Sequence, residues 1–148
     1  MRAIYQITET PIDLEALREE LADPGSGALA LFVGTTRNAF QGKAVRYLEY
    51  EAYRPLAERE MEGIGTEIAA RWPSVTGIAI AHRVGRVEIG EASVAIAVSS
   101  PHRRAALAAC AHGIERLKAT LPVWKKEVFA DGSEWRENVI EEDPHEGR

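Results

Sequence analysis

Three lysines stand around a proline and a tryptophan in the stretch LKATLPVWKKEVF, residues 117–129. A lysine beside a partly desolvated anion can bind that anion, transfer a proton if its pKa is lowered, or attack an acyl carbon. These three roles suit acyl or sulfur transfer. Lys118 ends a predicted helix, where the helix dipole alone also explains a cation. Lys125 and Lys126 point to opposite faces of a predicted strand, and we assign Lys125 to the pocket of Lys118.

A second basic group opens the same helix, in the segment SSPHRR at residues 99–104. A helix N-terminus presents unpaired amides and a positive dipole end, to which His102 and Arg103 add further donors. Cations are disfavoured at that end unless an anion binds, so an anion site is one explanation. An arginine that faces solvent or pairs with an acid is the other.

The loop GTTRN is a third candidate anion pocket, because it places Arg37 beside Thr35, Thr36 and backbone donors. It follows directly on an apolar strand. A solvated arginine in a loop is nevertheless the commoner case, so this fragment alone favours the simpler explanation.

The predicted helix separates two of these groups. Arg103 and Lys118 are 15 residues apart on it, which places their backbones about 22 Å apart at 1.5 Å per residue. They cannot easily hold one small ligand within a single chain. If both groups serve one site, the simplest solution is a homodimer in which one subunit supplies His102 and Arg103 and its partner supplies the lysines.

Several other chemistries lack support in the sequence. The four histidines show no close metal-ligand spacing and there is a single cysteine, so we predict neither a metal site nor a cofactor. Cys110 lies on an apolar helix face, which favours a buried small hydrophobic residue over a nucleophile. The serine-hydrolase signatures G-x-S-x-G and S-x-x-K are absent.

Length and charge limit the remaining possibilities. The 148 residues suit one domain, which we place at residues 1–136, followed by an acidic tail at 137–148 that we expect to fray. The formal net charge is −5, of which the tail carries −4 and the domain −1. A nearly neutral body argues against nucleic-acid or anionic-membrane binding. No apolar run approaches a membrane span or a signal region, and the single cysteine fits a reducing cytoplasm.

Hydrophobic periodicity predicts an α+β fold with the order β-α-β-β-α-β-β-α-β-β. We expect one domain, built on a largely antiparallel sheet with flanking helices. The apolar strand at residues 27–34 should be buried on both faces. Residues 86–100 should form one strand with a bend near Gly90, and Leu107 should share the buried face of the last helix. Asp131 and Gly132 predict a hairpin between the last two strands.

The segments FVGTTRN, SSPHR and LK…PVWKKE occur in this order, together with LEYEAY, RWP and AHRVGRVEIGEASVAIAVSSPHR. With this joint pattern the chain resembles the large, catalytic subunit of molybdopterin synthase, from about Gly27 to Trp135. The resemblance implies an α/β-hammerhead fold and a homodimer within a heterotetramer. It also implies a small ubiquitin-like sulfur-carrier subunit whose C-terminal thiocarboxylate enters the pocket. Two sulfur transfers would convert cyclic pyranopterin monophosphate (precursor Z) into the dithiolene of molybdopterin, during molybdenum cofactor biosynthesis.

The resemblance also assigns roles to particular residues. Lys118 and Lys125 match the catalytic lysines. The substrate site would include both lysines together with Thr35, Thr36, Arg37, His102, Arg103, Lys126 and Glu127. Because Cys110 is expected to be buried, sulfur should arrive on another protein, which a carrier thiocarboxylate satisfies.

Two other interpretations of the same residues remain. The first is a non-catalytic module that binds a phosphate ligand, in which Arg37, Arg103 and the lysines only hold an anion. The second is a structural dimer whose basic residues pair with the acidic tail.

Overall fold

The computed structural model describes residues 1–138, with side chains described to residue 136. Residues 139–148, which hold most of the predicted acidic tail, lie outside the described residues. The helices are α1 Leu14–Glu20, α2 Arg54–Arg71 and α3 Arg103–Thr120. The strands are β1 Arg2–Thr8, β2 Ala28–Thr35, β3 Ala39–Phe40, β4 Lys43–Ala52, β5 Gly77–Arg83, β6 Gly85–Glu88, β7 Ala92–Ser100, β8 Val123–Phe129 and β9 Glu134–Asn138.

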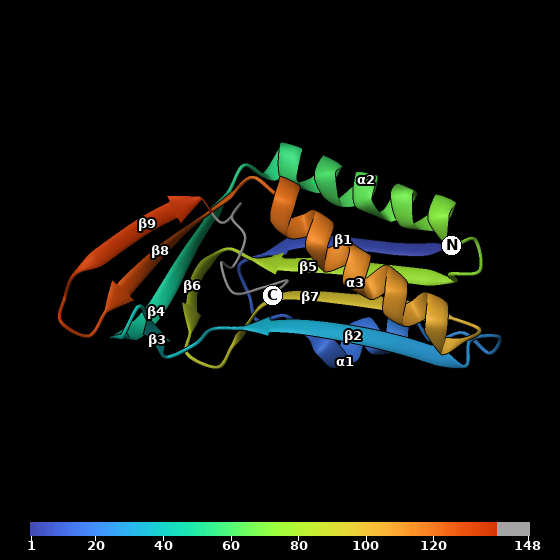
Figure 1. The fold of residues 1–148 in the computed structure, drawn as a ribbon, viewed down its shortest axis with the longest axis horizontal. Coiled ribbons are helices and arrows are strands. Elements are labelled where there is room, and N and C mark those ends of the chain that lie inside the picture. The colour runs from blue at the N-terminus through green and yellow to red at the C-terminus, as the bar shows by residue number, and fades with distance from the viewer. Residues whose placement is uncertain (139–148) are drawn as a thin grey trace.

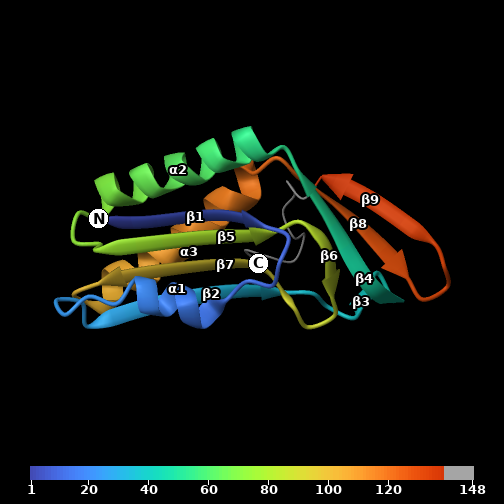
Figure 2. The ribbon, with the colours of Figure 1, turned by 180° about the vertical axis from the view of Figure 1, so that it is seen from behind.

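The strands form two sheets that meet end to end (Figure 1). The first has the order β1-β5-β7-β2, in which only the β1–β5 pair is parallel. The second has the order β3-β4-β8-β9, with β6 also paired to β4, and all of its pairs are antiparallel. Helices α2 and α3 cover one face of the first sheet, and α1 lies on the other face (Figures 1 and 2). The predicted α+β class and largely antiparallel pairing are confirmed.

In the central strands of the first sheet, large and small apolar residues alternate, so one face of the sheet carries large side chains and the other carries small ones. In β5, Ile78 and Ile80 face the main core beneath α2 and α3, whereas Ala79 and Ala81 face α1. The sequence AIAV in β7 repeats this arrangement in register with β5. Because successive side chains of a strand point to opposite faces, bulky residues fill the deep core, and alanines let the short α1 approach closely.

Strand β2 differs from its prediction, because only one of its faces is buried. Leu29 and Leu31 are 37% and 44% exposed. The strand lies at the edge of the first sheet, and α1 packs against Ala79, Ala81 and the alanines of β7 rather than over β2. The nearly continuous apolar run predicted a strand buried on both faces, but no element covers the second face of β2 in the described structure.

The predicted single strand at residues 86–100 is also wrong, because the chain divides it between the two sheets. Residues 85–88 pair with β4 in the second sheet, and residues 92–100 pair with β5 and β2 in the first. Gly85 begins β6 and Gly90 follows it, with φ of 81° and 85°, a region that favours glycine. This crossing places the end of β7 beside β4. The hairpin predicted at Asp131 and Gly132 is confirmed between β8 and β9.

Helix α3 packs against β2 and β7 through small residues. Its buried positions are Ala106, Ala109, Cys110, Gly113 and Leu117. The predicted burial of Leu107 is wrong, since 61% of this residue is exposed. The narrow small-residue stripe lets the helix lie close to the sheet, and Leu107 falls outside it. No helix in the described part of the chain is long and apolar enough to cross a membrane.

Two glycines in α2 should respond oppositely to alanine. A Cβ at the exposed Gly63 meets nothing within 4 Å, so Gly63→Ala should stabilise the protein by about 1 kcal/mol through helix propensity. A Cβ at the buried Gly65 would lie 1.8 Å from the hydroxyl of Tyr5. Gly65→Ala should therefore destabilise by about 1–3 kcal/mol, as overpacking does. Urea unfolding measures both; equal stability of the two variants would show that Tyr5 moves aside without cost.

Candidate functional site

A cavity of about 150 Å³ lies where the two sheets meet the C-terminal end of α3. Its walls come from the end of β2 and the following loop, from β3, β4, β7 and β8, and from α3. Five of the residues predicted from the sequence line it: Thr35, Arg37, Lys118, Lys125 and Glu127. Segments far apart in the chain thus bring three cations and one carboxylate to a single cavity.

Lys118 reaches the cavity from the last turn of α3 and has no acidic partner among the described residues. It is the exception among the four lysines of the chain. Each of the other three lysines forms an ion pair: Lys43 with Asp131 at 2.9 Å, Lys125 with Glu127 at 3.0 Å and Lys126 with Glu49 at 3.1 Å. The positive charge of Lys118 is therefore left for an anionic ligand.

Lys125 and Glu127 lie on the face of β8 that forms the cavity wall. Their register opposite Tyr50 and Leu48 fixes this orientation, because paired residues of neighbouring strands share a face. The side chains of Lys125 and Glu127 are 17% and 3% exposed, and Nζ lies 3.0 Å from Oε1. The second oxygen of Glu127, Oε2, is buried and has no hydrogen-bond partner within the described structure. It is placed to accept a hydrogen bond from a ligand.

Lys126 points away from the cavity, as strand alternation requires. Its Nζ lies 3.1 Å from Glu49 Oε2 and 3.6 Å from Glu134 Oε1. The hydrogen bond to Glu49 raises the pKa of Lys126, and the charge of Glu134 adds to this effect. Lys126 does not line the cavity, so the structure keeps it apart from Lys118 and Lys125.

The loop after β2 is fixed by its backbone. The amide of Thr36 donates to the carbonyl of Glu91 over 3.1 Å, and the amide of Gly90 donates to the carbonyl of Thr36 over 2.9 Å. Thr36 is itself buried and does not line the cavity, whereas the exposed Thr35 and Arg37 do. The role of Thr36 in this structure is to anchor the loop that presents Arg37.

His102 and Arg103 lie at the opposite end of α3 from Lys118 and do not line the cavity. Both are exposed, and His102 precedes the helix without a side-chain capping hydrogen bond. The 18 residues of α3 form one continuous helix. The separation of about 22 Å expected from helix rise therefore applies within one chain.

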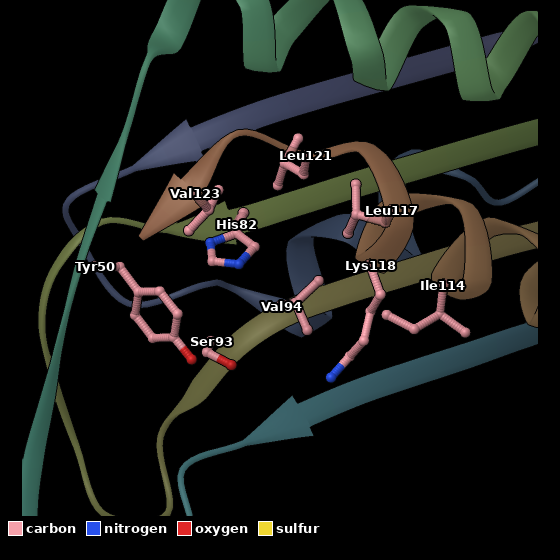
Figure 3. A pocket seen from close by; sticks show the side chains of 9 residues that line it. All are labelled: Tyr50, His82, Ser93, Val94, Ile114, Leu117, Lys118, Leu121 and Val123. Atoms are coloured by element: carbon pink, nitrogen blue, oxygen red, sulfur yellow. The ribbon is translucent and has the colours of Figure 1, made fainter. Parts of the chain in front are cut away.

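Lys118 also lines a smaller cavity of about 50 Å³ (Figure 3). Most of the polar residues that line this cavity were not predicted from the sequence. Tyr50, Ser93 and Lys118 line both cavities, whereas His82 lines only the smaller one. Ser93 is the extra residue of a β-bulge in β7, opposite the Gly34–Thr35 step. His82 could have been noticed in the sequence, because it is a polar residue at the end of an apolar strand, IAIAH at residues 78–82.

His82 is a buried, neutral histidine. Burial is the main reason why its pKa is lowered to about 4; the nearby charge of Lys118 also lowers the pKa, and a hydrogen bond to the Arg83 backbone opposes both effects. The ring packs edge-on against Tyr50 with 5.1 Å between centroids. At neutral pH His82 therefore adds no positive charge to the cavity.

Cys110 cannot serve the cavity. It is buried, does not line either cavity, and its Sγ lies 3.6 Å from the carbonyl oxygen of Ile96. Burial raises the pKa of the thiol, which disfavours the nucleophilic thiolate. Across residues 1–136 no cluster of three or more potential metal-ligating side chains occurs.

Known proteins resemble this chain over most of its length. A family model described as "MoaE protein" matches residues 7–120. A molybdopterin synthase catalytic subunit from Taeniopygia guttata is 53% identical over 120 residues, which cover 81% of this chain and 77% of that protein. The corresponding protein from Homo sapiens is 46% identical over 135 residues, with 91% of this chain and 71% of that protein covered.

Two further comparisons concern length and three-dimensional structure. A relative of the same name from Drosophila willistoni is 47% identical over 135 residues, but this chain spans 36% of its length. A crystal structure of molybdopterin synthase from Staphylococcus aureus superposes with a TM-score of 0.85 at 41% identity. That match covers 89% of this chain and 95% of the other.

Proposed function

Because this chain belongs to the MoaE family, which includes molybdopterin synthase catalytic subunits, we propose that it transfers sulfur to precursor Z and forms the dithiolene of molybdopterin. The observation that carries this proposal is the charge of Lys118, which has no acidic partner among the described residues, in a cavity that also holds Arg37, Lys125 and Glu127. Such a cavity suits an anionic sulfur donor and a phosphate-bearing substrate.

The sulfur comes from a second protein in this proposal. Cys110 is buried away from both cavities, and it is the only cysteine in the chain. A small carrier subunit with a C-terminal thiocarboxylate supplies the sulfur, and the name "catalytic subunit" among the relatives is consistent with a further subunit. Each transfer exchanges the thiocarboxylate sulfur for a substrate oxygen, so the carrier leaves as a carboxylate. Two transfers give the dithiolene.

The roles of the cavity residues follow from their positions. Lys118 and Lys125 neutralise the thiocarboxylate and move protons during addition and release of water. Arg37, on its anchored loop, contacts the anionic part of the substrate. Glu127 holds Lys125 and offers its second oxygen to a donor group of the ligand.

The complete site needs two copies of the chain in this proposal. His102 and Arg103 lie at the far end of α3, so a partner subunit brings them to the lysines. The exposed Leu29 and Leu31 of the edge strand β2 and the exposed Leu107 of α3 support a contact between copies near that end. A carrier bound to each subunit then gives a heterotetramer. We place the reaction in the cytoplasm.

Reconstitution tests the proposal. The purified chain, a thiocarboxylated carrier and precursor Z should together yield the dithiolene product. Cys110→Ala should retain substantial turnover, because its sulfur takes no part. A wild-type protein that folds and binds both partners without forming product would favour the alternative, a non-catalytic module that binds a phosphate ligand. Loss of turnover in a folded Cys110→Ala variant would instead indicate a persulfide route.

A further inference from the structure

The smaller cavity has no role in the reaction as proposed above, although Lys118 borders it. Its polar lining comes from Tyr50, His82, Ser93 and Lys118. Lys118 also lines the larger cavity, so its ammonium stands at the boundary between the two. An internal water molecule needs about 10–15 Å³ and two to four polar partners. The other lining residues are apolar, but the volume of about 50 Å³ and the four polar side chains meet both requirements for water next to Lys118.

The backbone contact of His82 determines which ring nitrogen can accept a hydrogen bond. Nδ1 lies 2.7 Å from the carbonyl oxygen of Arg83. A carbonyl oxygen only accepts, so Nδ1 carries the hydrogen and donates it. The buried ring is neutral at neutral pH, which leaves Nε2 without a hydrogen. Nε2 is therefore an acceptor on a ring that lines the cavity.

Lys118 is a donor with no hydrogen-bond acceptor among the described residues. No carboxylate among the described residues pairs with it, in contrast to the other lysines. Figure 3 shows Lys118 extending from α3 on one side of Val94, with the ring of His82 on the other side. The edge-on contact with Tyr50, at an interplanar angle of 77°, holds the His82 ring in place. The acceptor of His82 and the donor of Lys118 thus border one small cavity, whose remaining lining is mostly apolar.

We propose that His82 is a positioning residue for Lys118. Through water in the smaller cavity, Nε2 of His82 accepts a hydrogen bond that orients the Lys118 ammonium at the boundary of the larger cavity. This role rests on the proposed function, because it explains how an otherwise unpaired lysine is held ready for the sulfur-transfer step. A charged histidine would repel Lys118, so the burial that keeps the ring neutral is part of the arrangement.

Two substitutions at His82 separate positioning from packing. In His82→Asn the amide can replace Nδ1 as donor to the Arg83 carbonyl, but no atom remains at the position of Nε2. In His82→Gln the longer side chain returns an acceptor to that position. We expect kcat to fall about tenfold in His82→Asn, the worth of one hydrogen bond, and to recover most of its value in His82→Gln. KM for precursor Z and carrier affinity should stay within about twofold of wild type in both variants.

Equal kcat values in the two variants, at comparable melting temperatures, would overturn the positioning role. A second measurement does not need turnover. In ¹⁵N-histidine-labelled protein, Lys118→Met should shift the Nε2 resonance of His82, and Lys43→Met should leave it unchanged. An unshifted resonance in Lys118→Met would also overturn the proposal. Inactive wild-type protein would count against the proposed function alone, because the resonance test still decides the link between His82 and Lys118.

Discussion

Lys118→Ala should lower turnover by about 100- to 10,000-fold, the range expected when a proton-transferring side chain is removed. Carrier binding should be preserved, because the substitution removes one side chain that lines the cavity and leaves the rest of the surface intact. The substitution should also leave stability nearly unchanged, since Lys118 has no ion-pair partner in the described chain. Steady-state kinetics with thiocarboxylated carrier, together with a carrier-binding isotherm, measure both effects.

Lys43→Ala is the matched control for this experiment. Lys43 is exposed, as Lys118 is, but it pairs with Asp131 and does not line either cavity. Its removal should leave turnover unchanged within about twofold. Near-normal turnover in Lys118→Ala would show that Lys118 has no catalytic role, whatever the control shows.

Lys125→Ala gives a less direct answer than Lys118→Ala. It takes away the ion-pair partner of Glu127, whose side chain is 3% exposed. Leaving a buried carboxylate without its partner typically costs about 3–5 kcal/mol of stability. A loss of activity in Lys125→Ala must therefore be read beside its unfolding curve.

Co-expression of two inactive variants should restore activity if the site is shared between subunits. We expect Arg103→Ala and Lys118→Ala each to be nearly inactive as homodimers. In a heterodimer of the two, one site carries both substitutions and the other carries neither. A heterodimer purified through two different tags should therefore reach about half of wild-type turnover.

The same experiment excludes a site built within one chain. In that arrangement each site of the heterodimer would carry one substitution, and turnover would stay at the level of the inactive parents. A fully active Arg103→Ala homodimer would instead show that Arg103 has no part in the site. Sedimentation of each variant checks that the dimers form.

Sequence patterns predicted the α+β class and most element positions because periodicity reports local burial. They failed where burial depends on neighbours far along the chain. Residues 27–34 are apolar throughout, yet Leu29 and Leu31 are uncovered because β2 is an edge strand. Residues 86–100 have continuous β-propensity, but the positive φ at Gly90 ends one strand and lets the next join another sheet.

The site was predictable where strand alternation and helix position decide it. The alternation of VWKKEVF placed Lys125 and Lys126 on opposite faces, and helix length separated Arg103 from Lys118. His82 and Ser93 were not identified, because their positions depend on a bulge and on the meeting of two sheets. Thr36 matched a family position, but its side chain is buried beside the cavity rather than in it.

Helix α3 carries basic groups at both of its ends, which makes its length a fixed dimension of the enzyme. Removing one residue from an α-helix shortens it by 1.5 Å and turns its far end by about 100°. If one end serves its own site and the other serves the site of the partner, as proposed, no single insertion or deletion within Arg103–Thr120 preserves both. The β8–β9 turn at Asp131 and Gly132 carries no such constraint, since it lines neither cavity. Homologous chains should therefore vary in length at that turn and keep the residue count of α3 constant.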